Sequence, residues 1–451
     1  MDFVGPLFGT DRVNQIFADR TRLQRMLDFE AALAKAEARL GVIPVSAAVP
    51  IAAKCKTELF DLNELARASR DAGNLAIPMV KQLTALVAVD DKDGARFVHW
   101  GATSQDVIDT GLILQLRDAL ALIRGDVNQL CESVRKLADE HRATPVAART
   151  WLQQAVPTVF GLKAAGWLDA MTRHQERIDA LQRQVRVLQF GGAAGTLAAL
   201  GSRGLDVAHE LAKEMELDLP ALPWHAHRDR AAEVATTLAL LTGTLAKIAR
   251  DISLEMQTEV GEAFEPAGDG RGGSSTMPQK RNPTACAVVL AAGARIPGLT
   301  STMLAAMSQE HERGLGGWQA EWETLPEIVC LCAGALHQLA AAVAGLEVDK
   351  ARMGENLELS RGLIYAEAVS MALATKIGKR AAHEILQNAS RKAASHKEHL
   401  RDVLLADPAV TSQLSALEIH RLFDPLNYIG VADSFINRAI ESSKAQVGKA
   451  K

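Results

Sequence analysis

The chain has 451 residues, of which 48% are hydrophobic, and its formal net charge at pH 7 is −4. This length exceeds one ordinary hydrophobic core, so two or three domains are expected, and the lack of a basic charge excess argues against a nucleic acid partner. No apolar run approaches the length of a membrane span and the N-terminus has no signal-peptide pattern, so we expect no membrane partner. Five cysteines without metal-ligand spacing indicate reduced thiols in a cytoplasmic protein.

Residues 1–111 are expected to form an N-terminal domain of shorter helices. The domain ends in a polar stretch, HWGATSQDVIDTG over 99–111, in which Thr103 and Ser104 precede a helix with Asp106 in its first turn. Taken alone, this pattern is typical of an ordinary helix N-cap. His99 at the start of the stretch could equally be a helix-end residue, bind a carboxylate or assist proton transfer.

Residues 112–355 carry long apolar stripes whose steps alternate between three and four residues. Such spacing predicts long helices that pack at shallow angles, and no alternating run is strong enough to predict a sheet. A second apolar face on these helices would need a partner chain, so the pattern favours an oligomer. We therefore expect an all-α fold, with a central long-helix bundle over 112–355 and a C-terminal helical domain over 356–451. The stripes run from Ile113 to Leu137, from Trp167 to Leu188 with His174 at one position, and from Val234 to Ile252.

A second polar island, ARTWLQQAVP, lies inside the central region. It places Arg149, Thr150, Gln153 and Gln154 at what we expect to be the entry of another helix. A tryptophan such as Trp151 is, on its own, more often a core residue than a functional one.

A third island, GGSSTMPQKRNP over 272–283, interrupts the helical pattern with glycines and hydroxyl groups. The glycine density predicts a mobile loop, and Asn282 before Pro283 predicts a helix N-cap with a first-turn proline. A capped surface loop would explain those two residues but not the combination of Ser274, Ser275, Thr276 and Lys280. A lysine beside the donor-rich N-terminus of a helix would form an anion site.

The three islands together resemble the fumarase/aspartase superfamily, which includes adenylosuccinate and argininosuccinate lyases. GSSTMPQKRNP is similar to its signature loop, HWGATSQDVIDT to its first conserved region, and RTWLQQAVP to its second. The resemblance implies a three-domain, mostly helical homotetramer, with active sites built from three subunits and with no metal or redox cofactor.

The resemblance also implies roles for individual residues. The shared chemistry moves a proton at the carbon next to a carboxylate through an aci-carboxylate intermediate, and Ser274 is the residue that transfers this proton. Lys280 and His99 are the other implied catalytic residues, and preorganised donors stabilise the charge on the intermediate. The implied substrate-binding residues are Thr103, Ser104, Thr150, Trp151, Gln153, Ser275, Met277 and Asn282.

Trp151 marks a departure from the commoner pattern of the superfamily. Members that release an amine usually have a histidine here, in a THLQ context, because an amine leaving group needs a proton. A carboxylate leaving group does not, because the pKa of its conjugate acid is about 4. The TWLQ sequence therefore resembles the cycloisomerase branch, as do PWHAHRDR (223–230) and QEHERGLGGWQAEWETLPE (309–327). This likeness implies lactonisation of 3-carboxy-cis,cis-muconate to 4-carboxymuconolactone, in the protocatechuate branch of the β-ketoadipate pathway.

A small-molecule tricarboxylate substrate needs several cations. Arg313, Arg228 and Arg230 are candidates beside Lys280, although the two arginines that flank Asp229 could instead form surface or capping pairs. His225 and His227 are left unassigned. Two other functions remain open: a C–N lyase that releases fumarate, which Trp151 disfavours, and a silent helical scaffold, which the signature-loop residues disfavour.

Overall fold

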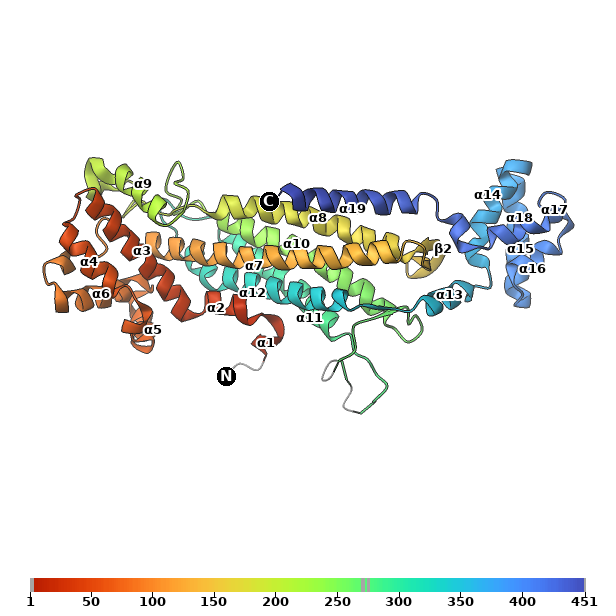
Figure 1. Cartoon of the computed structure of the whole chain (residues 1–451), viewed down its shortest axis with the longest axis horizontal. Helices are drawn as coiled ribbons and strands as arrows, with labels where there is room; N and C mark the ends of the chain where they lie inside the picture. The colour runs from red at the N-terminus through yellow and green to blue at the C-terminus, as the bar shows by residue number, and fades with distance from the viewer. Residues whose placement is uncertain (1–3, 269–271, 274–275, 450–451) are drawn as a thin grey trace. The chain divides into compact units, whose positions relative to one another are not determined.

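The structure is a computed structural model, and it describes residues 4–268, 272–273 and 276–449. Helices dominate the described residues, so the expected all-α class is confirmed (Figure 1). The chain divides into two compact units. The division into domains at 1–111, 112–355 and 356–451 remains a prediction. Unit 1 comprises residues 1–126, 176–245 and 288–337, and unit 2 comprises residues 127–175, 246–287 and 338–451.

Short and medium helices form the N-terminal part of unit 1. The longest of them, α3, packs against α4 and against α9 (Figure 1), and its apolar side chains are buried. Thr10 caps α2 and Asp61 caps α5, each through a side-chain oxygen that accepts backbone N–H groups. The N-terminal helices are α1 (Gly5–Phe8), α2 (Asp11–Phe17), α3 (Asp19–Arg39), α4 (Val45–Lys54), α5 (Leu62–Ala72) and α6 (Ala76–Asp90), and α9 (Gly204–Glu214) joins them from later in the chain.

Five long helices form the central part of the chain, and the apolar stripes predicted three of them. Every stripe residue is buried, including His174, although Leu188 lies beyond the end of its helix. Each of the five helices contributes a segment to both units. They are α7 (Ser104–Glu140), α8 (Phe160–Val185), α10 (Asp229–Glu255), α11 (Thr284–Ala305) and α12 (Gly317–Ala344).

The second polar island is not a helix entry, and that expectation was wrong. It folds into an antiparallel hairpin in which β1 (Pro145–Thr150) pairs with β2 (Gln153–Val159), and α8 begins only after the hairpin, at Phe160. A two-residue turn joins Thr150 to Gln153. The pattern was missed because this turn lacks the Asn-Gly or Asp-Gly sequence that normally marks such hairpins.

All but the last of the C-terminal helices of unit 2 share one apolar core, to which Ala147 of β1 also contributes. The hairpin is therefore anchored to these helices. A second, short pair of strands joins β3 (Ala263–Phe264) to β4 (Glu347–Val348). The C-terminal helices are α13 (Lys350–Glu358), α14 (Ala366–Ile377), α15 (Lys379–His396), α16 (Leu400–Leu405), α17 (Pro408–Thr411), α18 (Ala416–Leu422) and α19 (Ala432–Lys449).

Three of the described helices, α10, α11 and α12, are long and apolar enough to cross a membrane by length and composition. This differs from the expectation that no apolar run has that length. In α10 and α12, 50% and 67% of the apolar window is buried within the chain, whereas in α11 only 28% is buried. The apolar side chains of α10 and α12 thus pack largely in the core of this chain, whereas one face of α11 is exposed.

Candidate active site

The first polar island is organised around the carboxylate of Asp106, in the first turn of α7. Its oxygens accept backbone N–H groups from Thr103 at 3.0 Å, Gly191 at 3.0 Å and Gly192 at 2.9 Å. His225 Nε2 lies 2.7 Å from Asp106 Oδ1. Asp106 is fully buried, so it joins the start of α7 to two loops that are distant in sequence.

Arg313 also contacts this loop region. It donates to the hydroxyl of Thr103 at 3.0 Å and to the carbonyl oxygen of Ala193 at 2.9 Å. Ser104 is the first residue of α7 and is partly exposed. The structure therefore brings Arg313 and two of the predicted substrate-binding residues together within unit 1, with the arginine bound to protein oxygens.

His99 lies at the entry to the same island, with its Nδ1 atom 2.6 Å from Glu30 Oε1 on α3. Burial acts to lower the pKa of His99, but the charge and hydrogen bond of Glu30, with a further contribution from Asp106, outweigh it and raise the pKa. Glu30 is a neighbour that sequence reasoning missed, because 69 residues separate it from His99.

Arg228 lies inside unit 1 and is bound by protein carboxylates, which corrects the expectation that its guanidinium is free to bind a carboxylate of the substrate. The side chain is 1% exposed and forms ion pairs with Asp109 at 2.7 Å and Glu321 at 2.5 Å. Trp318 Nε1 also donates to Asp109, at 3.0 Å. Burial would lower the pKa of the guanidinium, but the two carboxylates raise it. Arg228 is an internal ion-pair residue, though not with its neighbour Asp229.

The other residues of the PWHAHRDR segment take different places. Arg230 is partly exposed and donates to the carbonyl oxygen of Gln184 at 3.2 Å. His225 is buried against Asp106, whereas His227 is exposed. Of the two flanking arginines, Arg230 is thus the one whose side chain reaches solvent.

Trp151 and Leu152 form the tip of the hairpin in unit 2. Their side chains are 96% and 80% exposed, and both residues have positive φ, 52° and 63°. Left-handed backbone is unfavourable for residues other than glycine, by about 1–3 kcal/mol each, and such strain is typical of functional positions. Thr150 and Gln153 pair with each other beside this tip and are also exposed.

The strands below the tip are held by a buried polar cluster. Arg149 forms two bonds to Glu262, of 2.7 and 2.6 Å, and Glu262 is fully buried. Asn356 Nδ2 donates to Glu262 at 2.7 Å, and Gln154 donates to the carbonyl oxygen of Asn356 at 2.7 Å. These bonds tie both strands to the helical part of unit 2, so they fix the direction in which the tip projects.

The signature loop lies in the same unit. Ser274 and Ser275 are outside the described residues. Met277 and Lys280 are exposed, and the N–H of Lys280 donates to the carbonyl oxygen of Met277. The N–H of Asn282 donates to the carbonyl oxygen of Gly272 at 2.8 Å, which closes the neck of the loop.

Gly272 is required at that neck for two reasons. Its φ of 65° lies in the left-handed region, and a Cβ atom there would come within 2.7 Å of the Asn282 carbonyl oxygen. Asn282 also donates from its side chain to the Gly273 carbonyl oxygen, at 3.3 Å.

The sequence predicted that Asn282 caps the helix after this loop and that the N-terminus of that helix forms an anion site, and both expectations were wrong. Glu265, not Asn282, caps α11, because its carboxylate accepts the N–H groups of Ala285 at 3.0 Å and Cys286 at 2.8 Å. These donors are therefore not available to an external anion. The adjacent Arg281 is bound to Glu347 at 2.9 Å and so anchors the loop rather than reaching into it.

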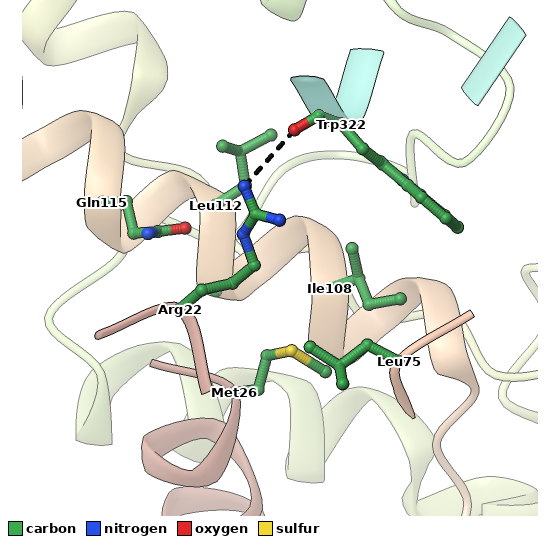
Figure 2. Close-up of a pocket in the computed structure, with 8 residues that line it drawn as sticks. Arg22, Met26, Leu75, Ile108, Leu112, Gln115 and Trp322 are labelled. Atoms are coloured by element: carbon green, nitrogen blue, oxygen red, sulfur yellow. Dashed lines mark hydrogen bonds between the residues drawn. The ribbon is translucent and has the colours of Figure 1, made fainter. Parts of the chain in front are cut away.

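A separate apolar cavity lies in unit 1 and contains none of the predicted site residues (Figure 2). Arg22 reaches over it and donates to the backbone oxygen of Trp322 at 3.4 Å. Its volume of about 70 Å³ is well below the roughly 300 Å³ at which ligand pockets begin, so we assign it no role in catalysis. Its lining residues are Arg22, Met26, Leu75, Ile108, Gly111, Leu112, Gln115 and Trp322.

Comparisons with known proteins agree with this geometry. A family model described as "Lyase" matches residues 8–298, and one described as "Adenylosuccinate lyase C-terminus" matches residues 362–439. The chain belongs to the fumarase/aspartase superfamily of lyases. The resemblance inferred from the three polar islands is thus confirmed.

Within this superfamily, the chain is similar to proteins named 3-carboxy-cis,cis-muconate cycloisomerase. It is 55% identical to the one from Pseudomonas aeruginosa, covering 95% of this chain and 94% of the relative. It is 52% identical to the one from Bradyrhizobium diazoefficiens, covering 97% of each. The crystal structure of the 3-carboxy-cis,cis-muconate lactonizing enzyme from Pseudomonas putida superimposes with a TM-score of 0.95 at 49% identity, over 99% of both chains.

Proposed function

We propose that this superfamily member is a cycloisomerase that converts 3-carboxy-cis,cis-muconate to 4-carboxymuconolactone, in the protocatechuate branch of the β-ketoadipate pathway. The observation that carries the proposal is the similarity to cycloisomerases over nearly the whole chain, at 52–55% identity. The alternative of an amine-releasing C–N lyase is not supported by these relatives.

In the proposed reaction one substrate carboxylate adds to a carbon that is conjugated to another carboxylate. The new C–O bond closes the lactone, and the electrons of the double bond move onto the second carboxylate to give an aci-carboxylate. Ser274 then gives a proton to carbon and regains one from solvent. Lys280, Asn282 and backbone N–H groups of the signature loop, rather than those that Glu265 caps at the start of α11, stabilise the intermediate, by about 3–4 kcal/mol for each well-placed donor.

Trp151 fits this reaction because no leaving group has to be protonated. The attacking group is already an ionised carboxylate, so a histidine acid at this position has no task. The exposed indole at the hairpin tip can instead shape an apolar wall of the pocket. Thr150 and Gln153, on either side of the tip, supply polar contacts to substrate.

Lys280, Arg313 and Arg230 are the proposed partners for the substrate carboxylates, together with His99. Thr103 and Ser104 at the start of α7, and Ser275 and Met277 in the signature loop, complete the binding surface. Arg313 donates to Thr103 and to a backbone carbonyl in this structure. A carboxylate would be a stronger acceptor for its guanidinium than these neutral oxygens.

We also propose that the enzyme is a homotetramer whose active sites combine residues from different subunits, and that it is cytoplasmic. The support is the exposure of Trp151 and Leu152. An exposed apolar tip of this kind is typical of a surface that another subunit buries. A stripe of small residues on α11 is exposed at heptad-like spacing, which suits close packing of helices from several chains. The stripe consists of Ala287, Ala294, Gly298, Ser301 and Ala305.

An absorbance assay with 3-carboxymuconate tests the function, run beside adenylosuccinate and argininosuccinate. The expected result is loss of the diene absorbance with 3-carboxymuconate and no fumarate formation from the other two compounds. Efficient cleavage of adenylosuccinate, with no lactone formed from 3-carboxymuconate, would overturn the proposal.

A further inference from the structure

Glu30 and His99 form a pair that links the buried side of α3 to the first conserved region. The Nδ1 and Oε1 atoms are 2.6 Å apart, and Glu30 is 1% exposed. The His99 side chain remains 17% exposed. Across the part of the chain that the structure describes, the ring makes no other hydrogen bond, so its Nε2 atom is available for a further contact.

The surroundings of the pair determine which charge the ring carries. A second buried glutamate on α3, Glu37, has its pKa raised to about 9 by burial and by the negative charge of Glu30. Glu37 is therefore neutral near pH 7 and needs no counter-ion. Among the described residues, His99 is the only basic side chain within ion-pair distance of Glu30. A buried carboxylate requires such a partner, which favours the imidazolium form of His99.

The backbone at His99 adds independent support for a functional role. Its φ of 59° lies in the left-handed region, which only a few per cent of non-glycine residues adopt, although histidine tolerates it better than most. Such conformations persist where surrounding contacts fix them, and they cluster at functional sites. The contact to Glu30 is one that can fix the ring, in a segment that leads directly to Thr103 and α7.

We propose that Glu30 is a positioning residue that holds His99 as an imidazolium, with Nδ1 toward Glu30 and Nε2 directed to a carboxylate of the substrate. The role in substrate binding rests on the proposed function. His99 then acts as a fixed cation rather than as a base, and it adds to the charge that a tricarboxylate requires. The charged groups that act on His99 are Glu30 on α3 and Asp106 on α7.

Histidine C2 hydrogen–deuterium exchange, followed by mass spectrometry of the peptide that contains His99, tests the first half of the proposal on the full-length protein. In the wild type the His99 pKa should lie above the ordinary value of about 6.5. Glu30→Gln should lower it by about one unit or more, and Glu30→Asp, which keeps the charge, should lower it less. Glu37→Gln is the matched control, because it changes a buried glutamate of the same helix that does not contact His99.

A wild-type His99 pKa at or below the ordinary value would overturn the proposal, as would a value that Glu30→Gln leaves unchanged. Because this measurement needs no substrate, it is decided separately from the proposed function. Should Glu30→Gln fail to fold, the wild type and Glu30→Asp still decide the question.

Steady-state kinetics with 3-carboxymuconate at pH 8 test the second half. Glu30→Gln should raise KM about tenfold, which corresponds to one pKa unit, and should change kcat much less. A fall in kcat with KM unchanged would show that His99 works in proton transfer and would overturn the carboxylate-binding role. Glu37→Gln should keep both constants.

Discussion

Arg149 and Glu262 face each other through two parallel bonds, of 2.7 and 2.6 Å, just below the hairpin tip that carries Trp151. The carboxylate is fully buried and the guanidinium is 23% exposed. This pair joins the strand that leads into the tip to the segment that precedes the signature loop.

Replacing Arg149 by methionine should therefore affect both stability and activity. Removal of one partner leaves the Glu262 charge buried without its counter-ion, which typically costs about 3–5 kcal/mol. We expect a clear fall in the apparent Tm and a rise in KM as the tip loses its fixed direction. Arg142→Met is the control, because Arg142 pairs with exposed acids of the same unit and should change the Tm little. Equal effects of the two variants would contradict a special role for the buried pair.

Ser274→Ala should remove most turnover and leave folding and assembly intact. Loss of a proton-transfer group typically lowers the rate by about 10²–10⁴-fold. The check is kcat for lactonisation, with circular dichroism and light scattering to confirm the fold and the oligomer. Near-normal turnover would mean that Ser274 only positions other groups.

Trp151→Phe should retain more activity than Trp151→His. Phenylalanine keeps an apolar ring at the tip, whereas histidine offers an acid for which lactonisation has no use. The measurement is kcat/KM against pH for the wild type and both variants. The introduced histidine should not add a pH range in which its protonated form increases kcat/KM. Faster lactonisation by Trp151→His than by the wild type would contradict the inference that the reaction needs no proton for a leaving group.

Mixed tetramers of two impaired variants should be more active than either variant alone. When Ser274→Ala and Trp151→His subunits assemble at random, about a quarter of the sites contain both native residues if these come from different subunits. Ser274→Ala mixed with Lys280→Met is the control, since both changes lie in one loop and no site is restored. Light scattering should report about four chains, and a fully active monomer would exclude shared sites.

Glu37→Gln should make stability less dependent on pH. The pKa of Glu37 is raised in the folded state from 4.5 to about 9, so folding favours its protonated form. The stability that this preference contributes is full below pH 4.5 and is lost as the pH rises toward 9. The variant lacks this loss, so its Tm should exceed that of the wild type by more at pH 8.5 than at pH 5.5. A constant difference between the two proteins would contradict the raised pKa.

The long helices could be predicted from the sequence because burial of α7, α8 and α10 repeats every three to four residues. The hairpin could not, because its Trp151–Leu152 turn has no glycine to signal a left-handed backbone. Its strands also contain two prolines, Pro145 and Pro157, and proline is unusual in a sheet.

The candidate site could be only partly predicted from the sequence, for a related reason. Motif resemblance identified residues on the three islands, but partner choice depends on contacts between distant segments. Arg228 suggested a pair with its neighbour Asp229, whereas the structure pairs it with Asp109 and Glu321, 119 and 93 residues away. Two acids three residues apart in an otherwise apolar turn, Asp106 and Asp109, were the one local signal that a buried polar network begins there.

The exposure of Trp151 has a consequence for how such enzymes diversify. A side chain that is 96% exposed in its own subunit contributes almost nothing to the core of that subunit. Because the strands below it are held by Arg149 and Glu262, the residue at the tip can change without moving its supports. Substitutions at this position can therefore be selected for their effect on the reaction, because they change the stability of the subunit little. A single substitution there can change the substrate without destabilising the fold.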